Sequence, residues 1–555
     1  MLMLKHSSSL RVFRFGFNEV KKTKIKNTNL QIVKNDPIKF YLGTMLLFLA
    51  LGFLVYASSL NHPFVMDDEV QVVQNTHIQT LNEFSTFFTS SSMDMGGKTK
   101  MGGIYYKPLM TSYYAIIWNF FGARPSAFRL PLLLIHILSS YLIFIFSMSF
   151  LSKNESLFLG LLFLIHPVNT EVVVYIADAQ DIFYFFFGVV GLNCIDKIED
   201  KKRLFATLLL FFSFGLLSKE TGVLFLFIGS AYAFFLRPHK RIPVFAAAMT
   251  TGFFYGVIRL AIGLTNTRIE NLIFHSLTFF ERLRMLPLIL GHYIEIFFFP
   301  LRLSLSTDFA IHEFSWRYFW QPLILLVFFG AILFKIVREL NQSPYKKQVH
   351  FFLTVIILWF ILHGQMLVPL DGVYADRWFY IGVWGLSSLL MIYFHHKFSS
   401  LKLKIILGLI LIIFSARSYV RSLDWEESLN LYTRESELHP WDATMNNNVG
   451  VELFRQNKIK ESESYFLKAT ELNPKWSVAW NNLGAVLEQK NDLTGAMNLY
   501  LKSANLGYSL AFENYTQILI KMGENEKANT FLKEKALPLY PQNTSLLRFW
   551  KMLNP

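Results

Sequence analysis

The sequence predicts an all-α protein in which a membrane-spanning helical bundle precedes a soluble array of helical repeats. Hydrophobic residues make up 53% of the 555 positions and charged residues only 17%, which is too apolar for one water-soluble globule. Long apolar runs recur up to about residue 420 and then stop. Beyond that point, a set of similar residues returns after 34 positions.

The charge distribution follows the same division. The net charge of +14 separates into +7 for residues 1–39, +9 for 40–423 and −2 for 424–555. Basic residues gather in the cytoplasmic loops of membrane proteins, so topology explains the excess and no nucleic-acid partner is predicted. Cys194 is the single cysteine, which excludes a disulfide scaffold.

The apolar runs predict about 11–13 membrane spans, since a helix needs about 20 apolar residues to cross the hydrocarbon core. The predicted segments are 40–58, 128–150, 155–165, 172–192, 204–217, 221–236, 243–261, 283–301, 320–337, 349–365, 378–394 and 403–419. The positions of Lys and Arg predict a basic cytoplasmic tail at 1–39 and an external loop at 59–107. Segment 283–301 is predicted to be either re-entrant or a tight pair of short passes, because both flanking loops fall outside.

Residues 421–555 are predicted to form an extracytoplasmic repeat domain of about three units. Asn447–Gly450 lines up with Asn481–Gly484, and Phe466 lines up with Tyr500. A degenerate third copy opens at Asn514. This period and its small/aromatic pattern are typical of tetratricopeptide repeats, which stack into a binding surface. The array therefore predicts recognition of a protein or peptide, with a purely anchoring domain as the alternative.

Three consecutive acids, Asp67, Asp68 and Glu69, stand in the external loop. Adjacent like charges raise one another's pKa, so one of them is a candidate general base. They are equally candidates for holding a divalent cation. The alternative is a solvated acidic turn at the start of a helix.

Four more ionisable residues, His166, Glu171, Asp178 and Asp181, lie where two apolar segments meet. Charges at membrane depth are costly and mark a site or a pathway. Asp178 and Asp181 are spaced to share one helix face. The alternative is a set of polar contacts that holds the bundle together.

Lys107 and Arg377 are candidates for binding phosphate, and Lys219 is a further candidate site residue. Lys107 follows two tyrosines, a pattern that also fits an interfacial anchor. Lys219 lies in a tight turn beside Glu220, with which it can pair. Arg377 offers bidentate phosphate binding, and an ion pair with Asp376 is its alternative. No nucleotide loop, HExxH motif or metal-spaced Cys/His set occurs, so no metal-binding motif is predicted.

In this order and spacing, the motifs resemble the transmembrane and tetratricopeptide repeat-containing O-mannosyltransferase family, which belongs to the glycosyltransferases of the GT-C fold. The resemblance covers residues 40–555, and several short motifs carry it rather than one long motif. It rests on Phe64-Val65-Met66-Asp67-Asp68, Tyr106-Lys107-Pro108-Leu109, His166-Pro167-Val168-Asn169-Thr170-Glu171, Leu217-Ser218-Lys219-Glu220-Thr221, Ala375-Asp376-Arg377-Trp378-Phe379-Tyr380 and Arg421-Ser422-Leu423-Asp424-Trp425.

The resemblance implies a membrane domain at 40–420 that transfers a sugar, mannose in the family, from a polyprenyl-phosphate carrier to an extracytoplasmic acceptor such as a protein hydroxyl. It implies Asp67 or Asp68 as catalytic base. The residues that it implies for binding substrate or phosphate are Lys107, His166, Glu171 and Arg377, with Glu69, Asp178, Asp181 and Lys219 as further candidates. Position 107 is Lys where the family usually has Arg, and position 376 is Asp where Glu is usual.

Two further expectations accompany this one. The repeats lie in a bacterial periplasm, or in the endoplasmic reticulum lumen if the source is eukaryotic. No cofactor besides the lipid-linked donor is required, with a divalent cation as the alternative. A non-catalytic, membrane-anchored scaffold for an envelope complex is the alternative function, and a transporter fits the long acidic loop and the repeats poorly.

Overall fold

The structure is a computed structural model that describes residues 37–92, 105–262, 277–305, 314–365, 370, 372–397 and 401–555. Within these ranges every regular element is a helix, which confirms the predicted fold class. Most of the predicted tail 1–39 and part of the loop 59–107 lie outside the described residues. The chain divides into two compact units, residues 1–43 and 44–555, and the candidate site described below belongs to the second.

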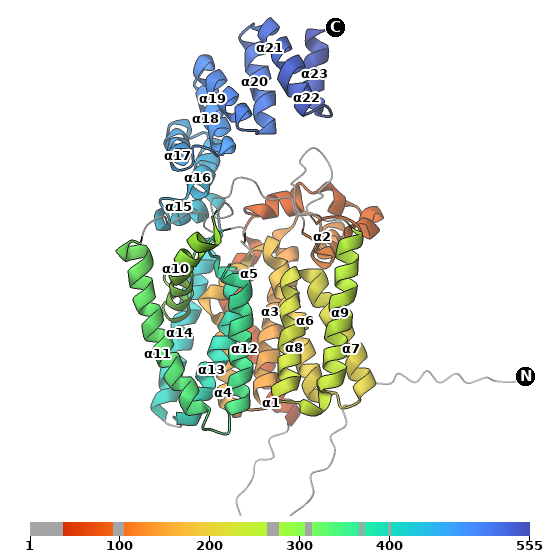
Figure 1. Ribbon diagram of the computed structural model, residues 1–555, viewed down its shortest axis with the longest axis vertical. Helices are drawn as coiled ribbons and strands as arrows, with labels where there is room; N and C mark the ends of the chain where they lie inside the picture. Colours follow the sequence, from red (N-terminus) through yellow and green to blue (C-terminus); the bar gives the residue numbers. More distant parts are fainter. Residues whose placement is uncertain are drawn as a thin grey trace, which may run out of the picture. The chain divides into compact units, whose positions relative to one another are not determined.

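Each of the twelve predicted apolar segments coincides with a helix (Figure 1). These helices are α1 Pro37–Tyr56, α3 Pro125–Ser147, α4 Lys153–Ile165, α6 Ala179–Lys197, α7 Lys201–Ser218, α8 Val223–Phe235, α9 Arg241–Ala261, α10 Phe279–Phe298, α11 Gln321–Leu340, α12 Lys346–His363, α13 Tyr380–Lys397 and α14 Leu401–Leu423. Six helices in the described ranges are long and apolar enough to cross a membrane, or seven if one bent pair is counted as a single span. The chain thus has the helices of an integral membrane protein.

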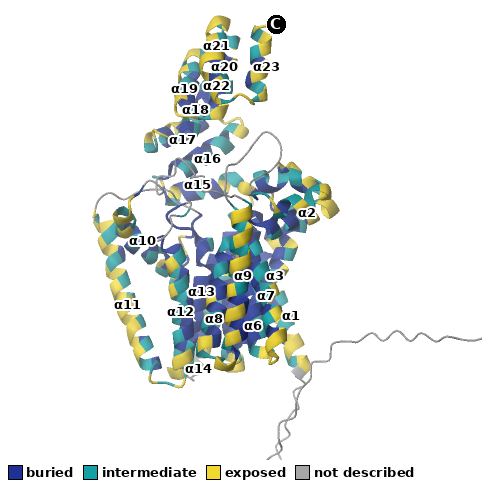
Figure 2. Cartoon of the chain, turned by 45° about the vertical axis from the view of Figure 1, so that its right-hand side comes forward, coloured by how far each residue is buried: buried dark blue, intermediate teal, exposed yellow. Residues whose placement is uncertain are grey.

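Apolar side chains cover the outside of this bundle as well as its core. The outer helix α9 exposes 79% of Ile242, 67% of Phe253 and 83% of Leu260, and Figure 2 draws its outward face as exposed. By contrast, α13 is mostly buried. An apolar exterior of this size is unfavourable in water but suits a lipid environment.

The predicted continuous segment 172–192 is wrong at its start, because the backbone there is broken. Helix α4 ends at Ile165, α5 (Thr170–Val174) follows, and a 3-10 turn, η6 (Ile176–Asp178), precedes α6. Within the predicted segment, Tyr175 leaves the helical region with φ −84° and ψ 113°. The end of α4 is a separate break: the residue before a proline is pushed out of the helical region, and His166 before Pro167 adopts φ −64° and ψ 125°. The break places Glu171, Tyr175 and Asp178 together at one end of the bundle.

Helix α10 is one continuous helix of 20 residues, which excludes the predicted pair of short passes. Thr278 and Glu281 form a capping box at its start. Both Figure 1 and Figure 2 draw α10 close to α15 (Ser428–Leu438), at the end of the bundle that carries the repeats. A re-entrant α10 stays a prediction. Helix α2 (Pro108–Phe121) was not expected from the sequence.

The repeat region contains the predicted helix pairs. They are α16 Ala443–Arg455 with α17 Ile459–Leu472, α18 Ser477–Gln489 with α19 Leu493–Asn505, and α20 Ser509–Lys521 with α21 Asn525–Phe531, followed by α23 Thr544–Leu553. A Cβ at Gly450 would lie 2.7 Å from the ring of Phe466, and one at Gly484 would lie 2.8 Å from the ring of Tyr500. The 34-residue pattern thus encodes a close helix–helix contact inside each of the first two repeats.

Candidate active site

The two adjacent acids of the external loop have opposite environments. Asp68 is fully buried, whereas Asp67 is exposed. Met66, with φ 54°, turns the chain immediately before them. The Asp67 carboxylate accepts no hydrogen bond and forms no ion pair with any residue in the described ranges. Asp67 is therefore the acid available to an incoming group.

Asp68 instead holds the loop against the bundle. Its Oδ1 accepts a hydrogen bond from the Ala177 amide at 2.8 Å, and its Oδ2 lies 3.7 Å from Nη2 of Arg129. Arg129 is 1% exposed and also donates to the carbonyls of His62, Pro63 and Val174. Burial raises the pKa of Asp68 to about 7, although the Arg129 charge opposes that rise.

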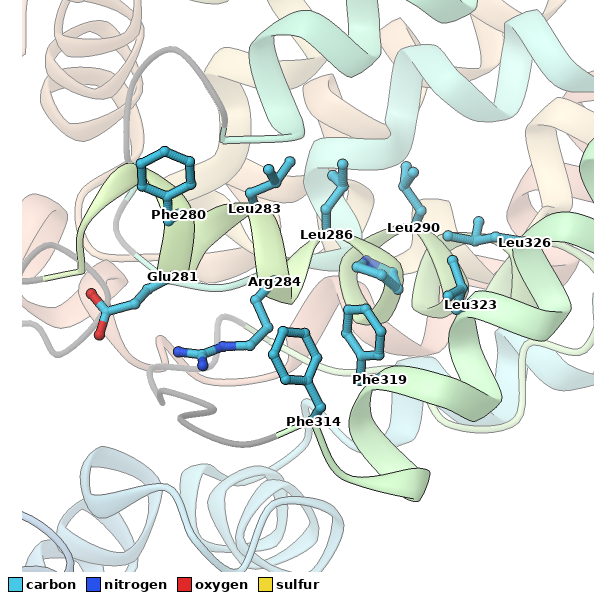
Figure 3. A pocket seen from close by; sticks show the side chains of 11 residues that line it. Phe280, Glu281, Leu283, Arg284, Leu286, Leu290, Phe314, Phe319, Leu323 and Leu326 are labelled. Carbon is cyan, nitrogen blue, oxygen red and sulfur yellow. The ribbon is translucent and has the colours of Figure 1, made fainter.

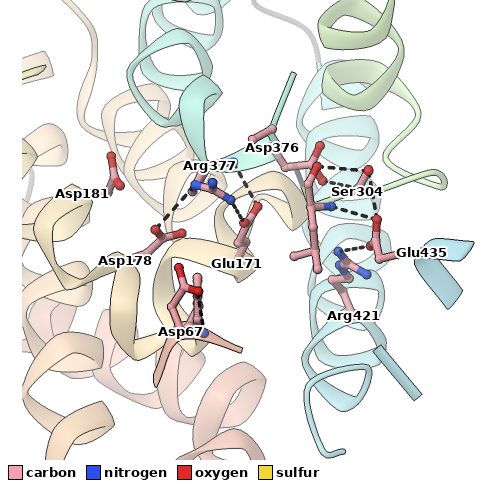
Figure 4. A network of polar contacts seen from close by, with 12 residues as sticks. Asp67, Glu171, Asp178, Asp181, Ser304, Asp376, Arg377, Arg421 and Glu435 are labelled. Atoms are coloured by element: carbon pink, nitrogen blue, oxygen red, sulfur yellow. Dashed lines mark hydrogen bonds and ion pairs between the residues drawn. The ribbon is translucent and has the colours of Figure 1, made fainter. Parts of the chain in front are cut away.

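Glu171, Arg377 and Asp178 form an ionic cluster beside Asp67 (Figure 4). Arg377 Nη1 lies 2.6 Å from Glu171 Oε1, and its Nε lies 3.6 Å from Asp178 Oδ1. The other Asp178 oxygen is buried without a hydrogen-bond partner. The Tyr175 hydroxyl accepts a hydrogen bond from the Asp67 amide at 3.2 Å. Burial, and after it the carboxylates of Asp67 and its neighbours, raises the pKa of Tyr175.

A second group of charges extends the cluster along the bundle. Lys219 Nζ contacts both oxygens of Asp181, at 2.7 and 2.8 Å. Lys107 is 6% exposed, and its ammonium lies 4.3 Å from the centre of the Tyr105 ring. No carboxylate in the described part of the chain lies within ion-pair distance of that ammonium. Burial lowers the pKa of Lys107, and the nearby charge of Glu220 opposes this.

Two ion pairs that the sequence offered as alternatives are wrong. Asp376 does not pair with Arg377, because its Oδ2 accepts from the Ser304 amide at 2.7 Å and its Oδ1 lies 3.2 Å from His292. Lys219 and Glu220 do not pair either, since Glu220 accepts a hydrogen bond from the Tyr106 amide at 3.0 Å.

His166 lies apart from the ionic cluster. It is fully buried, its Nε2 is 3.2 Å from the Phe297 carbonyl, and its Nδ1 accepts from the Val168 amide at 3.4 Å. Both ring nitrogens are thus engaged with backbone, and the ring stacks on Phe297 at 5.3 Å. Glu69 also lies elsewhere, 3.3 Å from Arg455 in the first repeat.

A third polar group joins the bundle to the first helix before the repeats. Glu435 of α15 is fully buried and accepts hydrogen bonds at 3.0 Å from the Ser304 hydroxyl and the Leu305 amide. Its other oxygen lies 3.3 Å from Nη2 of Arg421. Burial raises the pKa of Glu435 to about 7. Because Ser304 also binds Asp376, the group reaches the residue next to Arg377 (Figure 4).

An apolar pocket of about 600 Å³ lies between α10 and α11. Its lining residues are Phe280, Glu281, Leu283, Arg284, Leu286, Pro287, Leu290, Phe314, Phe319, Leu323 and Leu326. Figure 3 shows Glu281 and Arg284 toward one end of the pocket and Leu323 and Leu326 toward the other. Such a space can take a hydrocarbon chain with a charged end.

The described residues contain no group of three or more His, Cys, Asp or Glu side chains arranged to hold a metal ion. The divalent cation considered from the sequence stays a prediction. The residues that sequence reasoning missed are Arg129, Tyr175 and Glu435. Of these, Arg129 carried a signal, because it is a charged residue placed inside an apolar segment.

Comparisons with known proteins confirm the predicted resemblance. The tetratricopeptide repeat family model matches residues 443–475. The chain is similar to protein O-mannosyl-transferase TMTC3 of Homo sapiens, with 22% identity over 74% of this chain and 49% of that protein. It is also similar to protein O-mannosyl-transferase Tmtc1 of Drosophila melanogaster, with 24% identity over 24% of this chain and 16% of that protein. The alignments thus span about half, or less, of these relatives.

Among solved structures, the chain is similar to that of the APC/C hetero-tetramer Cut9–Hcn1. The identity is 12%, the alignment covers 81% of this chain and 90% of that chain, and the TM-score is 0.24.

Proposed function

We infer that the chain is a membrane glycosyltransferase of the GT-C type, which moves a sugar from a polyprenyl-phosphate carrier to a hydroxyl of an extracytoplasmic polypeptide. The observation that carries this inference is the free carboxylate of Asp67 beside a buried ionic cluster. The relatives named as O-mannosyl-transferases support mannose as the sugar.

In this reaction, Asp67 accepts the proton of the acceptor hydroxyl as the oxygen attacks the anomeric carbon. The bond between that carbon and the phosphate oxygen breaks, and the lipid phosphate leaves with the electron pair. A single displacement inverts the sugar carbon. The Asp67 amide is fixed by Tyr175, and Asp68 anchors the loop through Ala177 and Arg129, so the base is held in place.

Lys107 is the cation best placed to neutralise the departing phosphate. Lys219 is bound by Asp181, and Arg377 is bound by Glu171 and Asp178. The Lys107 ammonium is buried and contacts a tyrosine ring. A phosphate there would supply the counter-charge that burial demands.

The test is a transfer assay with the purified full chain, polyprenyl-phosphate mannose and a serine- and threonine-containing polypeptide, read by mass spectrometry. Asp67→Asn should lower the rate by roughly 10²–10⁴-fold, which is the usual contribution of a general base. Glu437→Gln, which changes an acid of α15 with no described ion pair, should retain activity. Equal rates for Asp67→Asn and the parent chain would exclude Asp67 as the base.

A further inference from the structure

Trp425 is buried against the candidate site, although it lies in the short connection between α14 and α15. The connection covers residues 424–427, and connections of this kind usually lie on the surface. Trp425 is nevertheless 0% exposed. Its ring stands 5.2 Å from the ring of Tyr175, with 34° between the two planes. Trp425 ends the motif that begins at Arg421, and the proposed function gives it no role.

Hydrogen bonds and ion pairs brace the turn that carries Trp425. The Trp425 amide donates to the Ser422 carbonyl at 3.2 Å. Arg421 Nη1 lies 3.0 Å from Asp424 Oδ2, and its Nη2 lies 3.3 Å from Oε1 of Glu435 in α15. The turn is thus tied both to α14 and to the helix that follows it, so its surroundings set the position of the indole ring.

Tyr175 passes this contact on to the main chain of Asp67. The Tyr175 hydroxyl accepts a hydrogen bond from the Asp67 amide at 3.2 Å. Tyr175 stands directly after α5, where the backbone leaves the helical region, so its side chain is placed by what packs on its ring. Trp425 packs there, and an aromatic pair contributes about 0.5–1.5 kcal/mol beyond the burial of its surface.

The turn before Asp67 makes a second contact with residues that follow the bundle. Met66 has φ 54°, a left-handed conformation that is uncommon for such a side chain and persists where neighbours hold it. Its side chain packs on a cluster that includes Tyr432 of α15 and Val449 of α16. Asp67 thus lies between two contacts supplied from beyond residue 423, whereas the bundle holds Asp68.

We propose that Trp425 is a positioning residue for the reaction: it holds Tyr175 in place, and Tyr175 fixes the main chain of Asp67 so that the carboxylate faces the acceptor hydroxyl. The proposal rests on the proposed function for the role of Asp67. It gives the segment after the bundle a part in the chemistry that does not depend on what the repeats bind. Misplacing a reacting group by about 1 Å can lower the rate roughly 10²-fold, so the effect should fall on kcat rather than on KM.

The first test follows the Asp67 amide and needs no sugar transfer. Hydrogen–deuterium exchange of the full chain in detergent, read by mass spectrometry on fragments that resolve residues 64–69, measures how firmly that amide is held. Tyr175→Phe removes the accepting hydroxyl and keeps the ring, so it should raise the exchange rate of the Asp67 amide roughly tenfold. Trp425→Ala should raise that rate to a similar degree. Trp425→Phe keeps an aromatic ring and should stay within about threefold of the parent rate.

Two controls separate this effect from a general loss of structure. Trp480→Ala removes a tryptophan of the second repeat whose indole donates to the Pro474 carbonyl, and it should leave exchange at residues 64–69 unchanged. Trp425→Leu keeps most of the apolar volume but no ring, so it replaces the alanine variant if thermal unfolding shows that variant to be unfolded. It should raise the exchange rate in the same direction.

The second test asks whether Trp425 acts through Asp67. Trp425→Ala should lower kcat roughly 10²-fold and leave the KM for the donor within about twofold. In a chain that already carries Asp67→Asn, the same substitution should have no further effect, because the base that it would misplace is absent.

Two results would overturn the proposal. One is an unchanged exchange rate of the Asp67 amide in both Tyr175→Phe and the Trp425 variant that lacks a ring. The other is an equal loss of kcat with and without Asp67→Asn, which would show that Trp425 acts independently of the base. A parent chain that transfers no sugar would overturn the proposed function, and the exchange rates would still decide whether Trp425 holds Asp67.

Discussion

Replacing Lys107 with Gln tests the assignment of the phosphate-binding cation. The lysine is 6% exposed, and no described carboxylate pairs with it. The neighbouring cations Lys219 and Arg377 are already neutralised. If the donor phosphate binds at Lys107, Gln removes the charge but keeps a polar side chain of similar length.

The expected loss follows from the burial. A hydrogen bond to a charged group contributes about 1.5–3 kcal/mol, which corresponds to roughly 10- to 150-fold in a binding or rate constant. The site is shielded from water, so the upper half of that range applies to kcat/KM for the donor. Lys107→Arg keeps the charge and should retain most of the activity.

The assay is the initial rate of sugar transfer over a range of donor concentrations. Lys490→Gln is the matched control, because Lys490 is an exposed lysine that pairs with Glu463 in the repeats. A Lys107→Gln rate within twofold of the parent rate would refute the assignment. Equal losses for Lys107→Gln and Lys107→Arg would also refute it, because they would show that shape rather than charge matters.

The pH dependence provides a second check of Lys107. Burial lowers the pKa of its ammonium from the usual 10.5. The ammonium is charged below its pKa and neutral above it. Donor affinity of the parent chain should therefore fall as the pH rises through the lowered pKa, at a lower pH than for an ordinary lysine. The affinity of Lys107→Gln should lack that step.

The remaining predictions concern stability, measured by thermal unfolding in detergent. Arg129→Met should lower the free energy of unfolding by about 3–5 kcal/mol because it leaves the Asp68 carboxylate buried and without an ion-pair partner. The control Arg548→Met, on the surface, should change the unfolding temperature little. Equal unfolding temperatures for the two variants would contradict this prediction. Gly484→Ala should lower the free energy of unfolding by about 1–3 kcal/mol through overpacking, since its Cβ would lie 2.8 Å from the Tyr500 ring. Gly256→Ala, whose Cβ would have no atom within 4 Å, should be neutral or stabilising. Burial raises the pKa of Glu435 from 4.5 to about 7, so the folded state binds this proton more tightly than the unfolded state. This difference stabilises the folded state by about 3 kcal/mol below pH 4.5, and the stabilisation is lost as the pH rises to about 7. The unfolding temperature of Glu435→Gln should therefore depend less on pH than that of the parent chain.

The helices of both regions could be predicted because their signals are local. A run of apolar residues sets the position of α9, and the 34-residue period sets the contact of Gly450 with Phe466. The end of α4 is also local in cause, because His166 precedes Pro167, and the predicted segments 155–165 and 172–192 leave that position in a loop. The second break, at Tyr175, was missed because Val172–Val174 continue the apolar pattern of a span.

The candidate site could be predicted only in part, since its contacts join distant segments. Arg377 meets Glu171 across 206 positions, and nothing near either residue distinguishes that partner from Asp376. The sequence indicated Asp67 and Asp68 as a pair, but the turn at Met66 decides which one is buried. Such a choice depends on how the loop packs against α3 and η6, which no local pattern records.

The contact of Glu435 with the bundle decides how the repeats must be tested. Arg421 is 1% exposed, and its described partners are Asp424 and Glu435. Deleting residues 424–555 would remove both acids and leave the Arg421 guanidinium without its described partners. It would also free Ser304, which holds Asp376 next to Arg377. Loss of activity on truncation would therefore be expected for an enzyme and for a scaffold alike. Point substitutions in the repeats that leave Glu435 in place separate the role of the repeats from the integrity of the site.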